Sequence, residues 1–151
     1  MIGLTWDVID WKNHTLTINK SLEYRHDKGY WRAGPPKTKK SHRTIPLTNR
    51  AYQILKSCYD EKDMRKESET LSQILNYTDS RTGEKKHLVM HDLVFVNWRT
   101  GEPAKNSSYD THLDKLCDEA GIKRFCMHAL RHTYATRAIE RGCSLKSCSS
   151  F

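Results

Sequence analysis

The hydrophobic pattern of this 151-residue chain changes its main period close to residue 48. Before that point, residues 15–19, 24–31 and 43–47 form three short runs typical of β-strands. After it, apolar residues recur at the spacing of helices. Gly34-Pro35-Pro36 interrupts regular structure between the second and third runs. We therefore expect an α+β fold that is mostly helical, with a small three-stranded antiparallel sheet, built as a meander, near the N-terminus.

The expected helices share apolar residues spaced three or four positions apart. They cover residues 49–59 with a charged continuation to residue 69, residues 71–77, a helix capped by Ser107 or Ser108 and ended by Gly121, and residues 127–141. Residues 79–86 read as a polar loop, and residues 93–97 as a short buried strand or extended segment.

Positive charge limits the partners that such a chain would attract. Lys and Arg total 26 against 18 Asp and Glu, which gives a formal net charge of +8. This excess favours the capture of polyanions, so nucleic acid is the first partner to consider. A basic RNA-binding protein is an alternative, but the aromatic stacking motifs of RNA-recognition modules are missing.

The five cysteines are scattered, and none forms a Cys-x-x-Cys pair. This pattern argues against a secreted disulfide scaffold and against a zinc ribbon. We expect reduced thiols, a cytosolic protein and no metal. No apolar run approaches the length that a membrane-spanning helix needs, and the N-terminus does not read as a signal peptide.

His128 and Arg131 stand three positions apart at the start of the last expected helix. That spacing places both side chains on one helical face, near the positive end of the helix dipole. A phosphate there would meet a guanidinium, an imidazole and free backbone amides. The bland alternative is a surface His/Arg pair on a basic helix.

A second basic segment contains Lys37, Lys39, Lys40 and Arg43, in the connection that leads into the third expected strand. A lysine at the tip of a hairpin could reach a phosphate or a leaving oxygen. The bland alternative is a solvated run of charge. These four residues and Arg131 are our candidate DNA contacts.

The string from His128 to Thr136, His-Ala-Leu-Arg-His-Thr-Tyr-Ala-Thr, closely resembles the His-x-Leu-Arg-His-Thr-x-Ala-Thr box of tyrosine-type site-specific recombinases. Lys37-Thr38, followed by Arg43-Thr-Ile-Pro-Leu, is similar to the hairpin of the same family. The run from Ile2 to Asp10 resembles the family's Gly-Leu-x-Trp-x-Asp-Ile-Asp segment. The resemblance covers nearly the whole chain and is weakest at residues 61–102.

The resemblance implies a DNA breaking-rejoining catalytic domain that needs neither metal nor nucleotide. A tyrosine attacks the phosphodiester, and double-stranded DNA is the substrate. Lys37 would be the general acid, with Lys39 the less favoured candidate, while His128 and Arg131 would stabilise the phosphate. We expect His132 to pack or to hydrogen-bond within the fold. Tyr134 is expected to be a core residue and not the nucleophile.

The chain departs from the family pattern at both ends. The first catalytic arginine would precede Met1, and the third box and the nucleophilic tyrosine would follow Gly142. Residues 143–151 suggest a frameshift. We therefore expect residues 1–151 to be an incomplete catalytic domain of bacterial or phage origin, inactive alone, without the N-terminal DNA-binding domain. Self-association through newly exposed apolar surface is expected. The alternative is a non-catalytic DNA-binding remnant.

Overall fold

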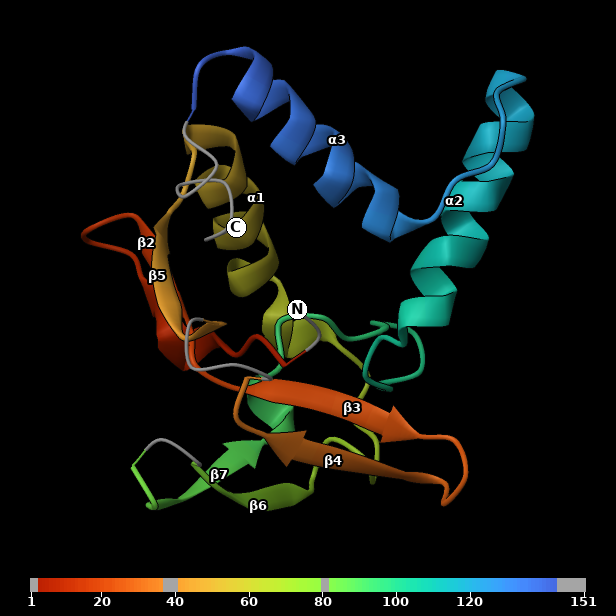
Figure 1. Cartoon of the computed structure of the whole chain (residues 1–151). Helices are drawn as coiled ribbons and strands as arrows, with labels where there is room; N and C mark the ends of the chain where they lie inside the picture. Colours follow the sequence, from red (N-terminus) through yellow and green to blue (C-terminus); the bar gives the residue numbers. More distant parts are fainter. Residues whose placement is uncertain (1–2, 37–40, 80–81, 144–151) are drawn as a thin grey trace. The chain divides into compact units, whose positions relative to one another are not determined.

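Strands dominate the first part of the computed structural model, which describes residues 3–36, 41–79 and 82–143 (Figure 1). The chain forms two compact units, Met1–Ala104 and Lys105–Phe151. The described part of the first unit contains all the strands and α1, and the second contains α2 and α3. The α+β class is therefore confirmed. The expectation of a mostly helical domain is not, because seven strands stand beside three α-helices in the described residues.

A three-stranded antiparallel sheet near the N-terminus has the order β1-β2-β5. Its strands are β1 (Ile9–Asp10), β2 (Thr15–Ile18) and β5 (Arg43–Pro46). The turn between β1 and β2 is held by the Asp10 carboxylate, which accepts hydrogen bonds from the amides of Lys12 and Asn13 at 3.0 and 2.9 Å. A short acidic side chain after a strand commonly fixes such a turn.

The expected meander of three consecutive strands is wrong. Residues 24–31 do not join β2 and β5, because they contribute to a separate hairpin of β3 (Ser21–Arg25) and β4 (Tyr30–Gly34). Asp27-Lys28-Gly29 makes its turn, and Gly29 adopts a φ of 69°, a conformation that glycine tolerates without steric cost. In the sequence, the hairpin is inserted between β2 and β5. These two strands pair with each other, and the last pair of their register is Ile18 with Arg43.

A second hairpin, β6 (Ile74–Thr78) and β7 (Lys85–Val89), lies against β4 within the same unit (Figure 1). The main hydrophobic cluster lies here. Its buried members are Leu22, Trp31, Ala33, Leu71, Leu88, Met90 and Leu93. Leu93 also forms an isolated antiparallel β-bridge with Thr5, and its side chain is buried. These two facts confirm that residues 93–97 begin as a buried extended segment.

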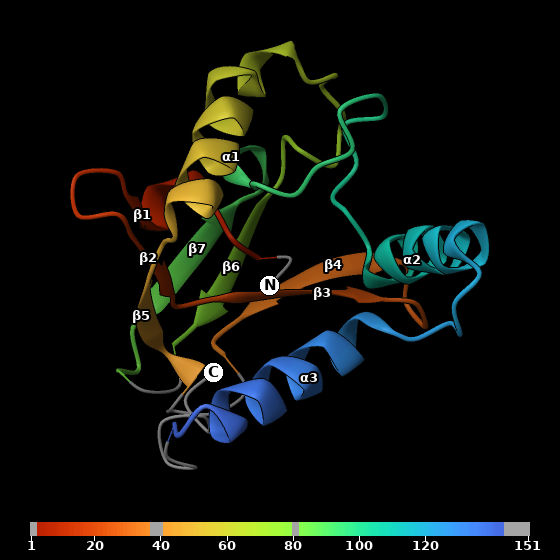
Figure 2. The same cartoon turned by 90° about the horizontal axis from the view of Figure 1, so that it is seen from above.

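Helix α1 (Asn49–Asp60) packs against a second cluster built on Trp6, Ile9 and Leu16. Figure 2 shows the helix next to β1. Trp6 belongs to a 3-10 turn, η1 (Trp6–Val8). The Thr48 hydroxyl accepts a hydrogen bond from the Ala51 amide at 3.2 Å, as an N-cap should. This cap and the apolar face confirm the predicted start of the helix.

The first predicted helix is shorter than expected, and the second is wrong. The helix ends at Asp60 instead of continuing to residue 69, and the chain forms a 3-10 turn, η3 (Lys62–Met64), and then becomes irregular. Residues 71–77 were expected to be helical, but β6 begins at Ile74. Burial alternates along β6, which is the period of a strand with one covered face. A further 3-10 turn, η4 (Met90–Asp92), follows β7.

The second unit consists of α2 (Asn106–Ala120) and α3 (Met127–Glu140). Gly121 ends α2 in the left-handed conformation, with φ 67°, as predicted. The predicted caps Ser107 and Ser108 are wrong, because Lys105 is the N-cap residue and both serines lie inside the first turn. Cys117 is buried. The predicted last helix is confirmed, with Gly142 just beyond it.

Candidate active site

His128 and Arg131 are the second and fifth residues of α3, so their side chains lie on one face of its first turns. Both side chains are exposed. Among the residues that the structure describes, Arg131 makes no hydrogen bond and no ion pair. Its guanidinium is thus available to an outside anion, and a guanidinium can bind a phosphate with two parallel hydrogen bonds.

The start of α3 is already occupied by a carboxylate. The Met127 amide donates a hydrogen bond to Asp110 Oδ1 at 3.0 Å, and the Ala129 amide donates to the carbonyl of Cys126 at 2.9 Å. Asp110 belongs to α2, so one helix of the unit caps the other. Two of the first three amides of α3 thus have partners within the chain, and contact between a phosphate and the backbone amides stays a prediction.

His132 contacts His128, which lies one helical turn before it. Its ring centroid lies 4.7 Å from that of His128, and the ring planes meet at 83°. Both rings are exposed, so His132 packs on its neighbour and not in a core. Tyr134 is 56% exposed, which contradicts its expected place as a core residue in the described part of the chain.

Three of the candidate residues, Lys37, Lys39 and Lys40, lie outside the described residues. The described strands on either side of this stretch, β4 and β5, belong to different sheets, because β4 pairs with β3 whereas β5 pairs with β2.

Arg43, the fourth candidate, opens β5 and is half-buried. Its Nη1 donates to the Ser41 carbonyl at 3.2 Å, and its buried Nε has no hydrogen-bond partner in the described chain. One nitrogen of its guanidinium is thus bonded to a backbone carbonyl. Arg43 belongs to the first unit, and His128 and Arg131 to the second. Their convergence on one phosphate stays a prediction.

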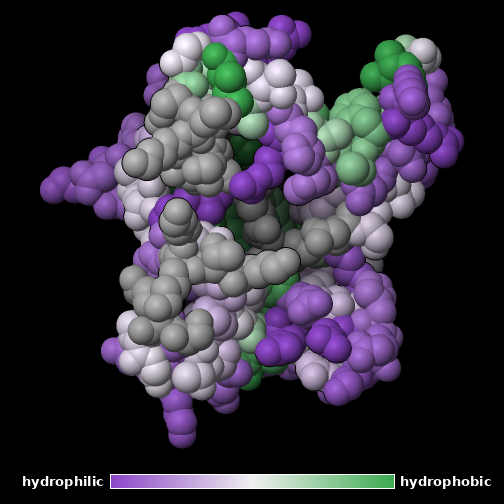
Figure 3. Space-filling view, in the orientation of Figure 1, coloured by the Kyte–Doolittle hydropathy of each residue, from purple (hydrophilic) through white to green (hydrophobic). Residues whose placement is uncertain are grey.

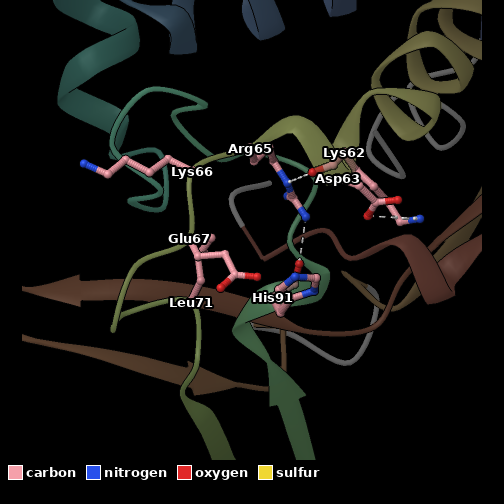
Figure 4. Close-up of a pocket in the computed structure, with 7 residues that line it drawn as sticks. All are labelled: Lys62, Asp63, Arg65, Lys66, Glu67, Leu71 and His91. Carbon is pink, nitrogen blue, oxygen red and sulfur yellow. Dashed lines mark hydrogen bonds and ion pairs between the residues drawn. The ribbon is translucent and has the colours of Figure 1, made fainter.

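Arg65 was not identified from the sequence, because it lies within a run of charged residues. Its guanidinium donates hydrogen bonds to the backbone carbonyls of Lys62 at 2.8 Å and His91 at 3.0 Å (Figure 4). It donates a third to the carbonyl of Leu93 at 2.7 Å. Burial lowers the pKa of this guanidinium below its ordinary value. Arg65 lines a small cavity of about 120 Å³ together with Lys62, Lys66 and His91. Two of these partners, His91 and Leu93, lie 26 and 28 positions away, so no local pattern could have revealed them.

No α-helix in the described ranges is long and apolar enough to cross a membrane. On the face drawn in Figure 3, hydrophilic side chains cover much of the described surface, and hydrophobic ones gather in smaller patches, one of them at the C-terminal end of α2.

The model of the phage integrase family matches residues 1–150, nearly the whole chain. The chain belongs to this family. The His128–Thr136 string and the segments around Lys37 and Ile2 thus carry a resemblance that the comparison confirms at the level of the family.

Curated members of the family are similar to the chain over almost all of its length. A tyrosine recombinase XerC-like protein of Caldanaerobacter subterraneus subsp. tengcongensis is 28% identical over 99% of the chain, which covers 37% of that protein. The transposase of transposon Tn916 from Enterococcus faecalis is 26% identical over 96% of the chain and is covered to 33%. The chain therefore spans about a third of the length of these relatives.

Solved structures agree on the fold. The integrase of transposon Tn1549, in complex with circular intermediate DNA, aligns with a TM-score of 0.72 and 20% identity, over 99% of this chain and 43% of that one. The XerA recombinase aligns with a TM-score of 0.61 and 17% identity, over 99% of this chain and 40% of that one. At these identities the likeness establishes the fold alone.

Proposed function

We propose that residues 1–151 form part of the catalytic domain of an integrase that breaks and rejoins double-stranded DNA in site-specific recombination. The observation that carries this proposal is the exposed His128–Arg131 pair at the start of α3, inside the string that resembles the recombinase box. The basic net charge of +8 and the DNA complexes of the Tn1549 integrase support it. Such a substrate would place the protein in the cytoplasm of a bacterial cell.

The proposed chemistry assigns each candidate residue a step. A tyrosine hydroxyl attacks the phosphorus, and the bond to the 5′ oxygen breaks, which leaves a 3′-phosphotyrosyl link. Arg131 and His128 would stabilise the extra negative charge on the phosphate, and Lys37 would give its proton to the leaving oxygen. Lys39, Lys40 and Arg43 would contact the backbone of the duplex.

The nucleophile and the first arginine are not assigned to any residue of this stretch. All seven tyrosines lie at or before Tyr134, and Tyr134 itself belongs to the box on α3. We propose that residues 1–151 alone bind duplex DNA without cleaving it. The alternative function, a DNA-binding remnant of an integrase, makes the same prediction for this stretch and differs in what surrounds it in the gene.

Duplex binding is tested by fluorescence anisotropy on random-sequence DNA of about 30 base pairs. Binding through phosphates falls by orders of magnitude between roughly 50 and 200 mM salt. A flat response, or no binding at low salt, would contradict the proposal. Cleavage is tested with nicked suicide substrates, where a covalent adduct abolished by substitution of one tyrosine would overturn the predicted inactivity.

Self-association is proposed separately, from the second unit. Several of its large apolar side chains are exposed, namely Leu116 (47%), Ile122 (53%), Leu130 (46%) and Tyr134 (56%). Exposed apolar surface of this kind favours association. Sedimentation over a concentration series should show dimers in the chain and fewer of them in Ile122→Lys, whereas a monomer at all concentrations would refute this proposal.

A further inference from the structure

Two imidazoles on α3 stand at a spacing that allows chelation. His128 and His132 are separated by four positions, which places them one above the other on the helix surface. Their ring centroids are 4.7 Å apart, and both side chains are exposed. Histidines four positions apart on one helical face supply two nitrogen ligands to a metal ion in known zinc sites.

The two rings are free to turn toward a shared ion. Apart from their mutual contact, neither ring has a hydrogen bond or an ion pair with the residues that the structure describes. Their planes meet at 83°, an edge-to-face packing that suits the metal-free state. Because only side-chain torsions must change to aim one nitrogen of each ring at a common point, the backbone of α3 can stay as it is.

We propose that His128 and His132 form an open site for a transition-metal dication of the Ni²⁺, Cu²⁺ or Zn²⁺ type. Imidazole nitrogen suits these ions, whereas Mg²⁺ and Ca²⁺ prefer oxygen ligands. No group of three or more metal-ligating side chains occurs in the described residues, so water would fill the remaining positions. The ion is therefore exchangeable and is not a resident cofactor.

Charge around the pair limits its affinity. Arg131 lies between the two histidines in sequence, and its guanidinium repels a dication. Water and salt screen this repulsion, because all three side chains are exposed. The site consequently selects ions that bind imidazole strongly enough to offset it.

Metal binding would compete with the role that the proposed function gives to His128. A metal takes one nitrogen of the His128 ring and fixes the direction of the other, so the ring is no longer free to turn its N–H toward a phosphate oxygen. We therefore expect Ni²⁺ to weaken duplex binding by the chain. This consequence rests on the proposed function, but the metal site itself does not.

The site is tested by calorimetric titration of the chain with Ni²⁺. We expect one ion per chain, and an affinity roughly tenfold or more lower in His132→Gln, because the second ligand of a chelate binds intramolecularly. His112→Gln makes the same change at a lone exposed histidine on α2 and should leave the affinity unchanged. Cys126→Ser, just before α3, should also leave it unchanged.

Three results would overturn the site: unchanged affinity in His132→Gln, loss of binding in Cys126→Ser, or loss in His112→Gln. Imidazole NMR signals give an independent measurement in the unaltered chain, where diamagnetic Zn²⁺ should shift the resonances of His128 and His132 together. If only one of them shifts, the chelate is refuted. If both shift but duplex binding is unaffected by metal, the site stands and its competition with phosphate at His128 is refuted.

Discussion

The carboxylate of Asp110 on α2 accepts a hydrogen bond from the backbone amide of Met127, the first residue of α3, at 3.0 Å. The N-cap residue of α3, Cys126, offers no side-chain hydrogen bond. A residue 17 positions earlier therefore supplies the cap that the local sequence lacks. This bond fixes where the helix that carries His128 and Arg131 begins.

Asp110→Ala should destabilise the start of α3. The loss of a cap and of a negative charge at a helix N-terminus costs about 0.5–2 kcal/mol. Hydrogen exchange should report faster exchange at His128 and Ala129, while Asp110→Asn, which keeps an acceptor oxygen, should show a smaller effect. Equal protection in all three proteins would show that the bond contributes nothing to the helix.

Arg131→Ala should weaken duplex binding roughly tenfold, because a charge-assisted bond to phosphate contributes about 1.5 kcal/mol. The slope of log affinity against log salt should fall by about one. Arg137→Ala is the matched control on the same helix, since Arg137 is also exposed but pairs with Glu140 at 3.3 Å. The measurement is an anisotropy titration. If both variants lose the same affinity, the loss comes from the general positive charge and not from a specific phosphate site.

Arg65→Met should destabilise the first unit by about 2–4 kcal/mol, because three carbonyls would lose a charged donor. Lys66→Met removes a charge from the next residue, whose side chain is exposed, and should change little. Tryptophan fluorescence in urea isolates this unit, which contains all four tryptophans, Trp6, Trp11, Trp31 and Trp98. If both variants unfold at the same urea concentration, the three bonds are dispensable.

Gly101→Ala and Gly83→Ala separate steric clash from backbone strain. Both glycines have positive φ, 69° and 73°, but a Cβ at Gly101 would overlap the carbonyl oxygen of Lys66, while a Cβ at Gly83 would meet nothing within 4 Å. We expect a cost of about 1–2 kcal/mol for Gly83→Ala from the left-handed conformation and about 3 kcal/mol or more for Gly101→Ala. The same urea assay measures both, and equal midpoints would refute the close approach.

The helices were predicted well where the local sequence offered both an apolar face and a residue that starts or ends a helix. Thr48 and the apolar face of α1 fixed the start of that helix, and Gly121 fixed the end of α2. The charged residues 61–69 favoured helix by composition. There Arg65 bonds to carbonyls near Leu93, and the Lys66 amide donates to the carbonyl of Trp98 at 3.0 Å. These distant partners hold the segment in an irregular conformation, which local propensity cannot anticipate.

Strand partners were harder to predict than strands. The runs at Thr15 and Arg43 were found, but a sequence does not say which runs pair, and β2 skips over a complete hairpin to reach β5. β6 was missed because Ile74–Thr78 is short, and only its pairing with Lys85–Val89 distinguishes it from a helix turn. The His128–Thr136 string, by contrast, is local, so its place on a helix followed directly from its sequence.

The pairing of Ile18 with Arg43 has a consequence for how much the protein can change. The segment that leaves the sheet at Ile18 returns at the facing position, so its two ends stay together whatever lies between them. Lengthening a loop whose ends are already joined costs little entropy, about 0.6 kcal/mol for each doubling. Residues can thus be added to the connection between β2 and β5 while the sheet keeps its register, whereas removal of the β3–β4 hairpin would uncover the cluster that contains Leu22 and Trp31.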